Sequence, residues 1–388
     1  MEQTDNPFLQ TEGLPPFDRM AAEQVVPAME KVLADAAAKI EEIEANLQPS
    51  WEDLLRPLEE LAVPLEYSWS CIGHLMGVKN RPELRAAHEQ MLPKVVELRL
   101  RLDQSRPVYE GLLAIRDGAG WDQLDEAQRR IVVQKIRTAE QAGVGLDGED
   151  KEKFLEISRE LSKISTDFSN HVLDARKAYE LILTDKSETA GWPESLRRVA
   201  ANSYTEVRGE EGSAVPENVA AATPEEGPWR ITLDYPSYMP FMQHHRNRQH
   251  REAVFRAQMR LASSGEYDNT ELITQTLRLR REQVALLGYA TFAEFSLDSK
   301  MAPDVTAVDR MTDELRDPSR RQAAQDLADL RDLAAESGQM EALQHWDLNF
   351  WAERMREQRF DYTDDLLRPY FPLPRVLEGL FGVCEWLF

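Results

Sequence analysis

The sequence predicts a predominantly all-α fold, built from many helices and a few short strands. Apolar residues recur every three or four positions over long stretches, which is the spacing of one face of a helix. The links between these stretches are short and polar or contain Pro and Gly, as at Gln48-Pro49-Ser50 and at 118–120. Neighbouring helices are therefore expected to run antiparallel. With 388 residues, the chain is long enough for two or more hydrophobic cores.

The longest apolar stripe predicts a helix of about eight turns, which needs tertiary packing to be stable in water. This stripe comprises Phe154, Ile157, Leu161, Ile164, Phe168, Val172, Ala175 and Tyr179. Two similar stripes comprise Val25, Met29, Val32, Ala36, Ile40 and Ile43, and then Leu84, Met91, Val95, Leu98 and Leu102. Each stripe predicts an amphipathic helix that turns its apolar face to a core.

Strand signals are few. Glu180–Thr184 and Trp229–Asp234 are short, β-compatible runs bounded by turn residues. The segment Arg208–Pro228 is rich in Gly, Pro, small and acidic residues, and it predicts a surface loop or a connector between domains.

Helical periodicity resumes after this loop. A helix is expected over 271–287, with its N-cap in Asp268-Asn269-Thr270 and its C-terminal stop at Gly288. The predicted organisation is an N-terminal helical domain over 1–190, a connector loop region over 191–228 and a second domain over 229–388.

Composition and charge narrow the classes of function. The formal net charge is −23, from 46 basic and 69 acidic side chains, and this field repels phosphate backbones and anionic lipid. No stretch approaches the ~20 apolar residues of a membrane span, and the N-terminus lacks the pattern of a signal peptide. The two cysteines, Cys71 and Cys384, fit a reducing compartment. We therefore expect a soluble cytoplasmic protein with no nucleic-acid or membrane partner.

A zinc hydrolase on a helical scaffold would carry two histidines four residues apart, with Glu after the first. His88-Glu89 begins like this HExxH motif, but position 92 is Leu. His88 lies four residues after Leu84 and three before Met91, at the edge of an apolar stripe. We interpret His88 as a structural histidine in a packed helix.

His244, His245 and His250 form the one local histidine cluster of the sequence. Their spacings do not place the rings on one helical turn, so a polar helix that begins near Arg246 is the preferred interpretation. Adventitious binding of a transition metal stays open as the alternative. His74, His171 and His345 are isolated in the sequence.

Signals for a nucleophile are equally thin. The sequence has no G-x-S-x-G elbow, no P-loop and no G-x-G-x-x-G after a strand. Cys384 lies among apolar residues, which predicts burial of its thiol. Paired carboxylates such as Asp364-Asp365 are interpreted as solvated helix faces in so acidic a chain. The sequence patterns thus predict no catalytic or metal-binding side chain, and they do not identify substrate-binding residues.

Eight stretches of the sequence resemble one family, and they occur in its order along nearly the whole chain. They are Leu14-Pro15-Pro16-Phe17-Asp18, Ser70-Cys71-Ile72-Gly73-His74-Leu75, Asp167-Phe168-Ser169-Asn170-His171-Val172, Leu233-Asp234-Tyr235-Pro236-Ser237-Tyr238-Met239-Pro240, Leu286-Leu287-Gly288-Tyr289-Ala290-Thr291-Phe292, Lys300-Met301-Ala302, Trp346-Asp347-Leu348 and Arg368-Pro369-Tyr370-Phe371-Pro372. Through these stretches the chain resembles the thimet oligopeptidase family of zinc metallopeptidases, and most of all its oligopeptidase A branch.

The resemblance implies a two-lobed, mostly helical peptidase that cleaves short peptides, including remnants of signal peptides. The family's site is an HExxH helix with a downstream Glu, in which zinc polarises the carbonyl and the motif Glu activates water. These 388 residues contain no HExxH, so no family catalytic residue is carried over to any position and no zinc is expected to bind them specifically. The expected match is the N-terminal helical domain and the first part of the peptidase domain, truncated before the zinc-binding helix.

The last thirteen residues are strongly apolar, and this feature leads to three hypotheses. Their apolar members are Val376, Leu377, Leu380, Phe381, Val383, Trp386, Leu387 and Phe388. Such a helix needs a partner surface, and uncovered it would promote aggregation. We expect a truncated oligopeptidase that is inactive alone. The alternatives are half of a split peptidase completed by a partner chain that carries HExxH, and a helical protein that binds peptides without cutting them.

Overall fold

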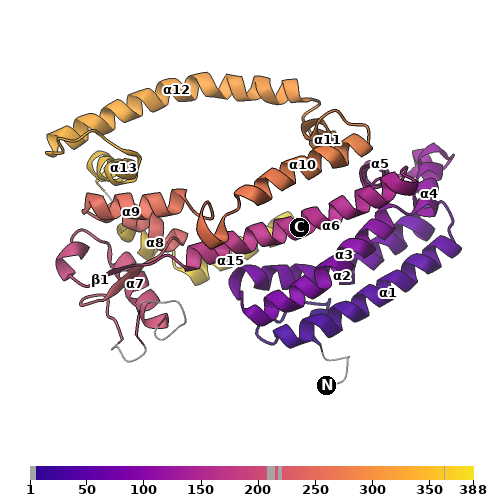
Figure 1. The fold of residues 1–388 in the computed structure, drawn as a ribbon, viewed down its shortest axis with the longest axis horizontal. Coiled ribbons are helices and arrows are strands. Elements are labelled where there is room, and N and C mark those ends of the chain that lie inside the picture. The colour runs from indigo at the N-terminus through magenta and orange to yellow at the C-terminus, as the bar shows by residue number, and fades with distance from the viewer. Residues whose placement is uncertain (1–5, 208–214, 217–220, 362) are drawn as a thin grey trace. The chain divides into compact units, whose positions relative to one another are not determined.

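The computed structural model describes residues 6–207, 215–216, 221–361 and 363–388. The chain divides into two compact units, each formed by two separate stretches of sequence. Unit 1 comprises Met1–Thr166 and Leu272–Asp309, and unit 2 comprises Asp167–Glu271 and Arg310–Phe388. Helices dominate both units, which confirms the predicted fold class (Figure 1).

Unit 1 is made of helices alone in the part of the chain that the structure describes. They are α1 (Val25–Ala45), α2 (Arg56–Val78), α3 (Pro82–Asp103), α4 (Arg106–Asp117), α5 (Glu126–Gln141), the first part of α6 (Gly148–Lys177), α10 (Thr270–Leu286), α11 (Phe292–Asp298) and the start of α12 (Val305–Glu336). The two short predicted stripes lie on α1 and α3, which pack on each other. All but Leu102 of their residues are buried, which confirms both stripes.

The long stripe on α6 is buried in only one part. Phe154, Ile157 and Ile164 are buried, and α10 packs on this stretch through Leu279, whereas Phe168 is 38% exposed. The helix ends at Lys177 and therefore excludes Tyr179. The helix predicted over 271–287 is α10.

The ends of α10 match the sequence expectation. The Asp268 carboxylate accepts the backbone N–H of Thr270 at 2.9 Å, as a capping side chain does. Gly288 has φ +82°, the left-handed conformation that ends many helices.

Unit 2 contains the two strands and a second helical core. Strand β1 (Leu181–Leu183) pairs antiparallel with β2 (Trp229–Ile231), within the two runs that the sequence predicts. The helices are the end of α6, α7 (Glu194–Glu206), α8 (Tyr235–His244), α9 (Arg248–Met259), most of α12, α13 (His345–Phe360), α14 (Asp364–Leu367) and α15 (Leu373–Leu387). The core lies between β2, α7 and α8.

One sequence expectation needs correction in this unit. Residues 191–228 are predicted as a connector loop, but the structure places α7 inside them. Leu196, Ala200 and Tyr204 are four residues apart and buried, so the segment carries its own apolar face. Of the predicted loop Arg208–Pro228, residues 208–214 and 217–220 lie outside the described residues.

Helix α15 exposes its apolar side chains. Their exposed fractions run from 40% at Leu377 to 83% at Trp386, and none of its residues is buried. So apolar a helix is expected to pack on a partner surface, and among the described residues no such surface covers it. Across the described part of the chain, no helix combines the length and the apolar character that crossing a membrane requires.

Candidate functional site

The turn between α8 and α9 brings buried aromatic and imidazole rings together. The ring of His245, fully buried, stacks on Phe241 with centroids 4.3 Å apart and on His250 with centroids 5.3 Å apart. Trp192 meets the same ring edge-on. The spacing of five residues does not predict contact between His245 and His250, because it does not place both rings on one helical turn. The chain reverses here and α9 begins at Arg248, with Asn247 as its N-cap, close to the predicted start.

Hydrogen bonds fix the chemical form of His245. The Trp192 indole N–H donates to Nδ1 of His245 at 3.2 Å, so this nitrogen is the acceptor of a neutral ring. The remaining proton lies on Nε2, which donates to Nδ1 of His250 at 3.1 Å. Burial, followed by the proximity of His250 and Arg251, lowers the pKa of His245 to about 3. His245 is therefore a neutral packing residue at physiological pH.

A buried ion cluster lies beside this ring stack and joins α9 to α13. Arg251 is 2% exposed and donates from Nη2 to Asp347 at 2.8 Å, while Arg248 donates to both oxygens of the same carboxylate. Arg251 also donates to the carbonyl of His245 at 2.8 Å and lies over the ring of Phe350. These cations hold the pKa of Asp347 below its usual range although burial raises it. The cluster fixes the positions of α8, α9 and α13.

His244 points into a different environment. Its Nδ1 accepts a hydrogen bond from Nη2 of Arg354 at 3.0 Å, because a guanidinium only donates. Arg354 also donates to both carboxylate oxygens of Glu357. A cavity of about 240 Å³ opens here, with Trp192, Gln243, His244, Glu357 and Thr363 among the residues that line it. It combines an aromatic wall with amide and hydroxyl groups, which is the composition of sites that bind small polar ligands.

The isolated histidines pack within their own regions. His88 is half-buried and stacks on Trp69 with centroids 4.8 Å apart, and burial lowers its pKa. It thus has the surroundings of the structural histidine that the sequence indicates. His171 donates from Nδ1 to Asn269 at 2.8 Å. His74 contacts Phe17, and His345 stacks on Phe255.

The cysteines differ from each other, and one prediction is wrong. Cys71 is buried and burial raises the pKa of its thiol. Cys384, predicted to be buried, is exposed because the apolar residues around it on α15 are exposed as well. Asp364 and Asp365 belong to α14, and their side chains lie outside the described residues.

The histidine cluster does not fit a zinc ion. Among the residues that the structure describes, no group of three or more His, Cys, Asp or Glu side chains is arranged to hold a metal. Both ring nitrogens of His245 are engaged with Trp192 and His250, which leaves no lone pair directed at a shared ion.

Sequence reasoning missed the ion cluster and the cavity. Asp347 stands in the run Trp346-Asp347-Leu348, which contributes to the family resemblance, but nothing in its neighbourhood indicates that it pairs with residues about 100 positions earlier. Arg251 lies on a mostly polar helix, so its burial, which indicates a buried ion pair, can be recognised only once the fold is known. The cavity likewise assembles residues from 191–195, 240–244 and 357–368.

Comparisons with known proteins agree with this helical architecture. Residues 29–151 match the model of the neurolysin/thimet oligopeptidase N-terminal domain, and residues 241–388 match the model of peptidase family M3. The fold and these matches define a helical protein that is similar to peptidases of this kind. The chain is therefore similar to peptidase family M3 over residues 241–388, in line with its resemblance to the thimet oligopeptidases.

Individual relatives support the same assignment. The chain is 43% identical over 387 residues to "Probable cytosolic oligopeptidase A" of Arabidopsis thaliana, which covers 99% of this chain and 54% of that protein. It is 36% and 35% identical to "Oligopeptidase A" of Salmonella typhimurium and of Escherichia coli, over 99% of this chain and 55% of each relative. The chain thus spans about half the length of the curated relatives that it matches.

Proposed function

We propose that this chain serves in the zinc-dependent hydrolysis of short peptides, as the helical part of an oligopeptidase A-type enzyme. One observation carries the proposal. Two family models, for the N-terminal domain and for the peptidase region, match this chain in that order, and 43% identity to an oligopeptidase A extends over 99% of it. These relatives are named as oligopeptidases, which are enzymes that cleave peptides.

The 388 residues alone are proposed to be inactive. Zinc in this family polarises the scissile carbonyl and is held by an HExxH helix, and this motif is absent from the 388 residues. The His245 cluster does not replace it, because both ring nitrogens are engaged. Activity therefore requires an HExxH segment joined to this chain or supplied by a partner chain.

The cavity beside His244 is our candidate for peptide contact. Amide and hydroxyl groups such as those of Gln243 and Thr363 match the N–H and C=O groups of a peptide, and Trp192 offers an apolar wall. Arg354 holds both Glu357 and His244 in place, so the wall is rigid before a ligand arrives. Peptide binding here needs no catalytic residue.

A cleavage assay tests the proposed activity. The purified 388-residue chain, supplied with zinc, is expected to give no chelator-sensitive cleavage of a short quenched-fluorescent peptide. A chimera that continues into the unmatched remainder of the Arabidopsis relative is expected to cleave it, and replacing the HExxH glutamate by Gln should abolish that activity. A folded but inactive chimera would contradict the proposal, as would chelator-sensitive turnover by the 388 residues alone.

Peptide binding by the chain itself distinguishes the alternatives. Fluorescence anisotropy of a labelled short peptide should show saturable binding that Gln243→Ala weakens several-fold and that Gln249→Ala, on the exposed side of α9, leaves unchanged. Binding without activity in any chimera would favour a non-catalytic peptide-binding protein. Activity restored by a separate HExxH chain would favour a split peptidase.

We also propose a cytoplasmic location. Support comes from the Arabidopsis relative named as cytosolic, although another relative of 43% identity is named as chloroplastic and mitochondrial. Fluorescent tagging of the chain followed by fractionation would separate the two.

A further inference from the structure

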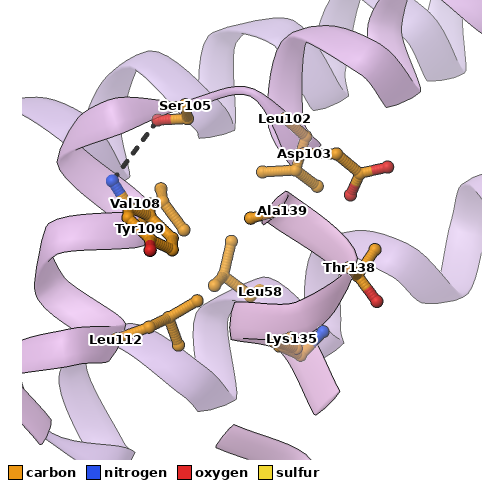
Figure 2. A pocket seen from close by; sticks show the side chains of 10 residues that line it. All are labelled: Leu58, Leu102, Asp103, Ser105, Val108, Tyr109, Leu112, Lys135, Thr138 and Ala139. Atoms are coloured by element: carbon orange, nitrogen blue, oxygen red, sulfur yellow. Dashed lines mark hydrogen bonds between the residues drawn. The ribbon is translucent and has the colours of Figure 1, made fainter. Parts of the chain in front are cut away.

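Unit 1 contains a pocket that the proposed peptidase function does not use. It lies between α2, α3, α4 and α5 and has a volume of about 120 Å³ (Figure 2). Leu58, Leu102, Val108, Leu112 and Ala139 give it an apolar lining. Enclosed apolar cavities of about 150 Å³ hold benzene, so this pocket, which is somewhat smaller but not fully enclosed, can take a small apolar group such as a ring or a short branched chain.

Most polar groups around the pocket already have partners. Ser105 donates to Glu44 at 2.7 Å, and the hydroxyl of Tyr109 donates to Glu140 at 2.9 Å. Lys135 forms an ion pair with Glu59 at 2.7 Å. Because these three side chains already have partners, a ligand in the pocket would gain little from a hydrogen bond to them.

Asp103 is different. Its half-buried carboxylate makes no hydrogen bond or ion pair with any residue that the structure describes, although it lines the pocket. Burial raises the pKa of Asp103 to about 6, while the charges of Lys135 and Arg99 lower it. An unpaired carboxylate against an apolar wall is costly for the folded protein, and a cation placed beside it would remove that cost.

The arrangement of the lining groups gives the ligand its orientation. In Figure 2, Asp103, Thr138 and Lys135 lie on one side of the pocket, and Tyr109 and Leu112 lie on the other. A ligand that fits both sides has an apolar body and one polar end. Because the Asp103 carboxylate has no hydrogen-bond or ion-pair partner among the described residues and Lys135 is already paired with Glu59, the complementary end is a cation.

We propose that this pocket is a binding site for a small primary amine, whose apolar group fills the cavity and whose ammonium group pairs with Asp103. The net charge of −23 favours the approach of cations to the protein. The site stands apart from the peptide chemistry proposed above, and it requires neither zinc nor the HExxH motif.

Calorimetry with two matched probes tests this site on the whole chain. Benzylamine and benzyl alcohol have nearly the same shape, but the amine alone is charged at pH 7.5. We expect the amine to bind at least about tenfold more tightly, since a charge-assisted contact with Asp103 adds to the same apolar burial. Equal affinities, or no saturable binding of the amine, would overturn the proposal.

Three variants locate the contact. Asp103→Asn keeps the shape and should remove the preference for the amine, whereas Glu110→Gln, an exposed carboxylate on α4, should not. Ala139→Met fills the cavity and should weaken both probes, with circular dichroism to confirm the fold. Binding of the amine should also weaken below pH 6, where Asp103 is protonated. An unchanged amine preference in folded Asp103→Asn would place the cation elsewhere and refute the site.

Discussion

The cores of the two units are built from different chemistry. In unit 1, side chains such as Met29, Ile40, Ile72 and Met91 are fully buried among other hydrocarbon groups. In unit 2, the buried residues near α9 include Arg251 and Asp347. Both cores exclude water, but among the residues that the structure describes, buried charged side chains occur only in unit 2.

This difference predicts how each unit responds to change. A hydrocarbon core loses stability in proportion to the volume and area removed, and the loss does not depend on pH. A core with buried charges depends on complete pairing, because a single unpaired charge is far more costly than a missing methyl group. Unit 2 should therefore respond more strongly than unit 1 to charge substitutions and to acid.

The largest effect should follow from Asp347→Ala. The substitution leaves Arg251 buried without its carboxylate, and removing one partner of a buried pair costs about 3–5 kcal/mol. Hydrogen exchange measured by mass spectrometry should show lost protection in α8, α9 and α13, with α1–α3 unchanged. Glu252→Ala is the control, because the Glu252–Arg256 pair on α9 is exposed and should cost less than about 1 kcal/mol. Similar losses of stability in both variants would contradict the prediction that the buried pair contributes more than the exposed pair.

A hydrocarbon deletion in unit 1 should have the next largest effect. Ile72→Ala removes a fully buried side chain from α2 and should destabilise unit 1 by about 2–5 kcal/mol. Val63→Ala, on the same helix but 55% exposed, should change stability by less than about 1 kcal/mol. The cost of Ile72→Ala should be the same at pH 7 and pH 5 by urea denaturation. A pH-dependent cost would break the contrast between the two cores.

Acid should weaken unit 2 through His245. Its pKa is about 3 in the folded chain and ordinary in the unfolded chain, so the unfolded state binds the extra proton and stability falls as pH drops below about 6.5. The titratable or charged residues next to the His245 ring are His250, Arg251 and Glu188. Between pH 6.5 and pH 5 the loss should be on the order of 2 kcal/mol.

His245→Gln tests this assignment. The Gln amide is neutral and does not titrate, so the acid-dependent loss in unit 2 should become smaller by about the same amount. His74→Gln, on the exposed side of α2, serves as the matched control. Exchange rates at α8 and α9 over pH 5–7 report the effect. An identical pH slope in His245→Gln would show that another group carries it.

Much of the fold follows from local patterns in the sequence. The stripe from Val25 to Ile43 identifies both α1 and its buried face, because helical spacing and burial depend on the same residues. Strands β1 and β2 follow in the same way from short β-compatible runs. The prediction of a loop over the segment of α7 is wrong. Small and polar residues around Ala200 and Ala201 make its apolar stripe weak in the sequence, but in the fold this stripe is buried against the core.

The candidate sites depend on pairings that no local pattern encodes. Asp347 meets Arg248 and Arg251 across about 100 residues, and the spacing rule for one helix does not describe the turn that stacks His245 on His250. For Cys384 a local pattern is present, but it leads to a wrong prediction. Its apolar neighbours predict burial, but burial requires a second surface, and within the described residues α15 has none.

The smallest effect should come from Asp103 in unit 1, with a sign opposite to that of His245. Its folded pKa of about 6 lies above the unfolded value of 3.8, so the folded state binds the proton more tightly. Stability carried by this group is full below pH 3.8 and is lost as pH rises through 6. Because the side chain is half-exposed, the change should be on the order of 1 kcal/mol, and the lowered pKa of His88 opposes it.

Asp103→Asn should therefore stabilise unit 1 at pH 7 by on the order of 1 kcal/mol and add nothing at pH 4, where the carboxylic acid is already neutral. Glu110→Gln, exposed on α4, should change stability by less than about 0.5 kcal/mol at either pH. Urea denaturation followed by exchange at α3 and α5 measures both variants. A gain for Asp103→Asn that is equal at the two pH values would exclude the titration of this carboxyl as its cause. Asp103 could then no longer be contrasted with the acid-sensitive ring of His245 in unit 2.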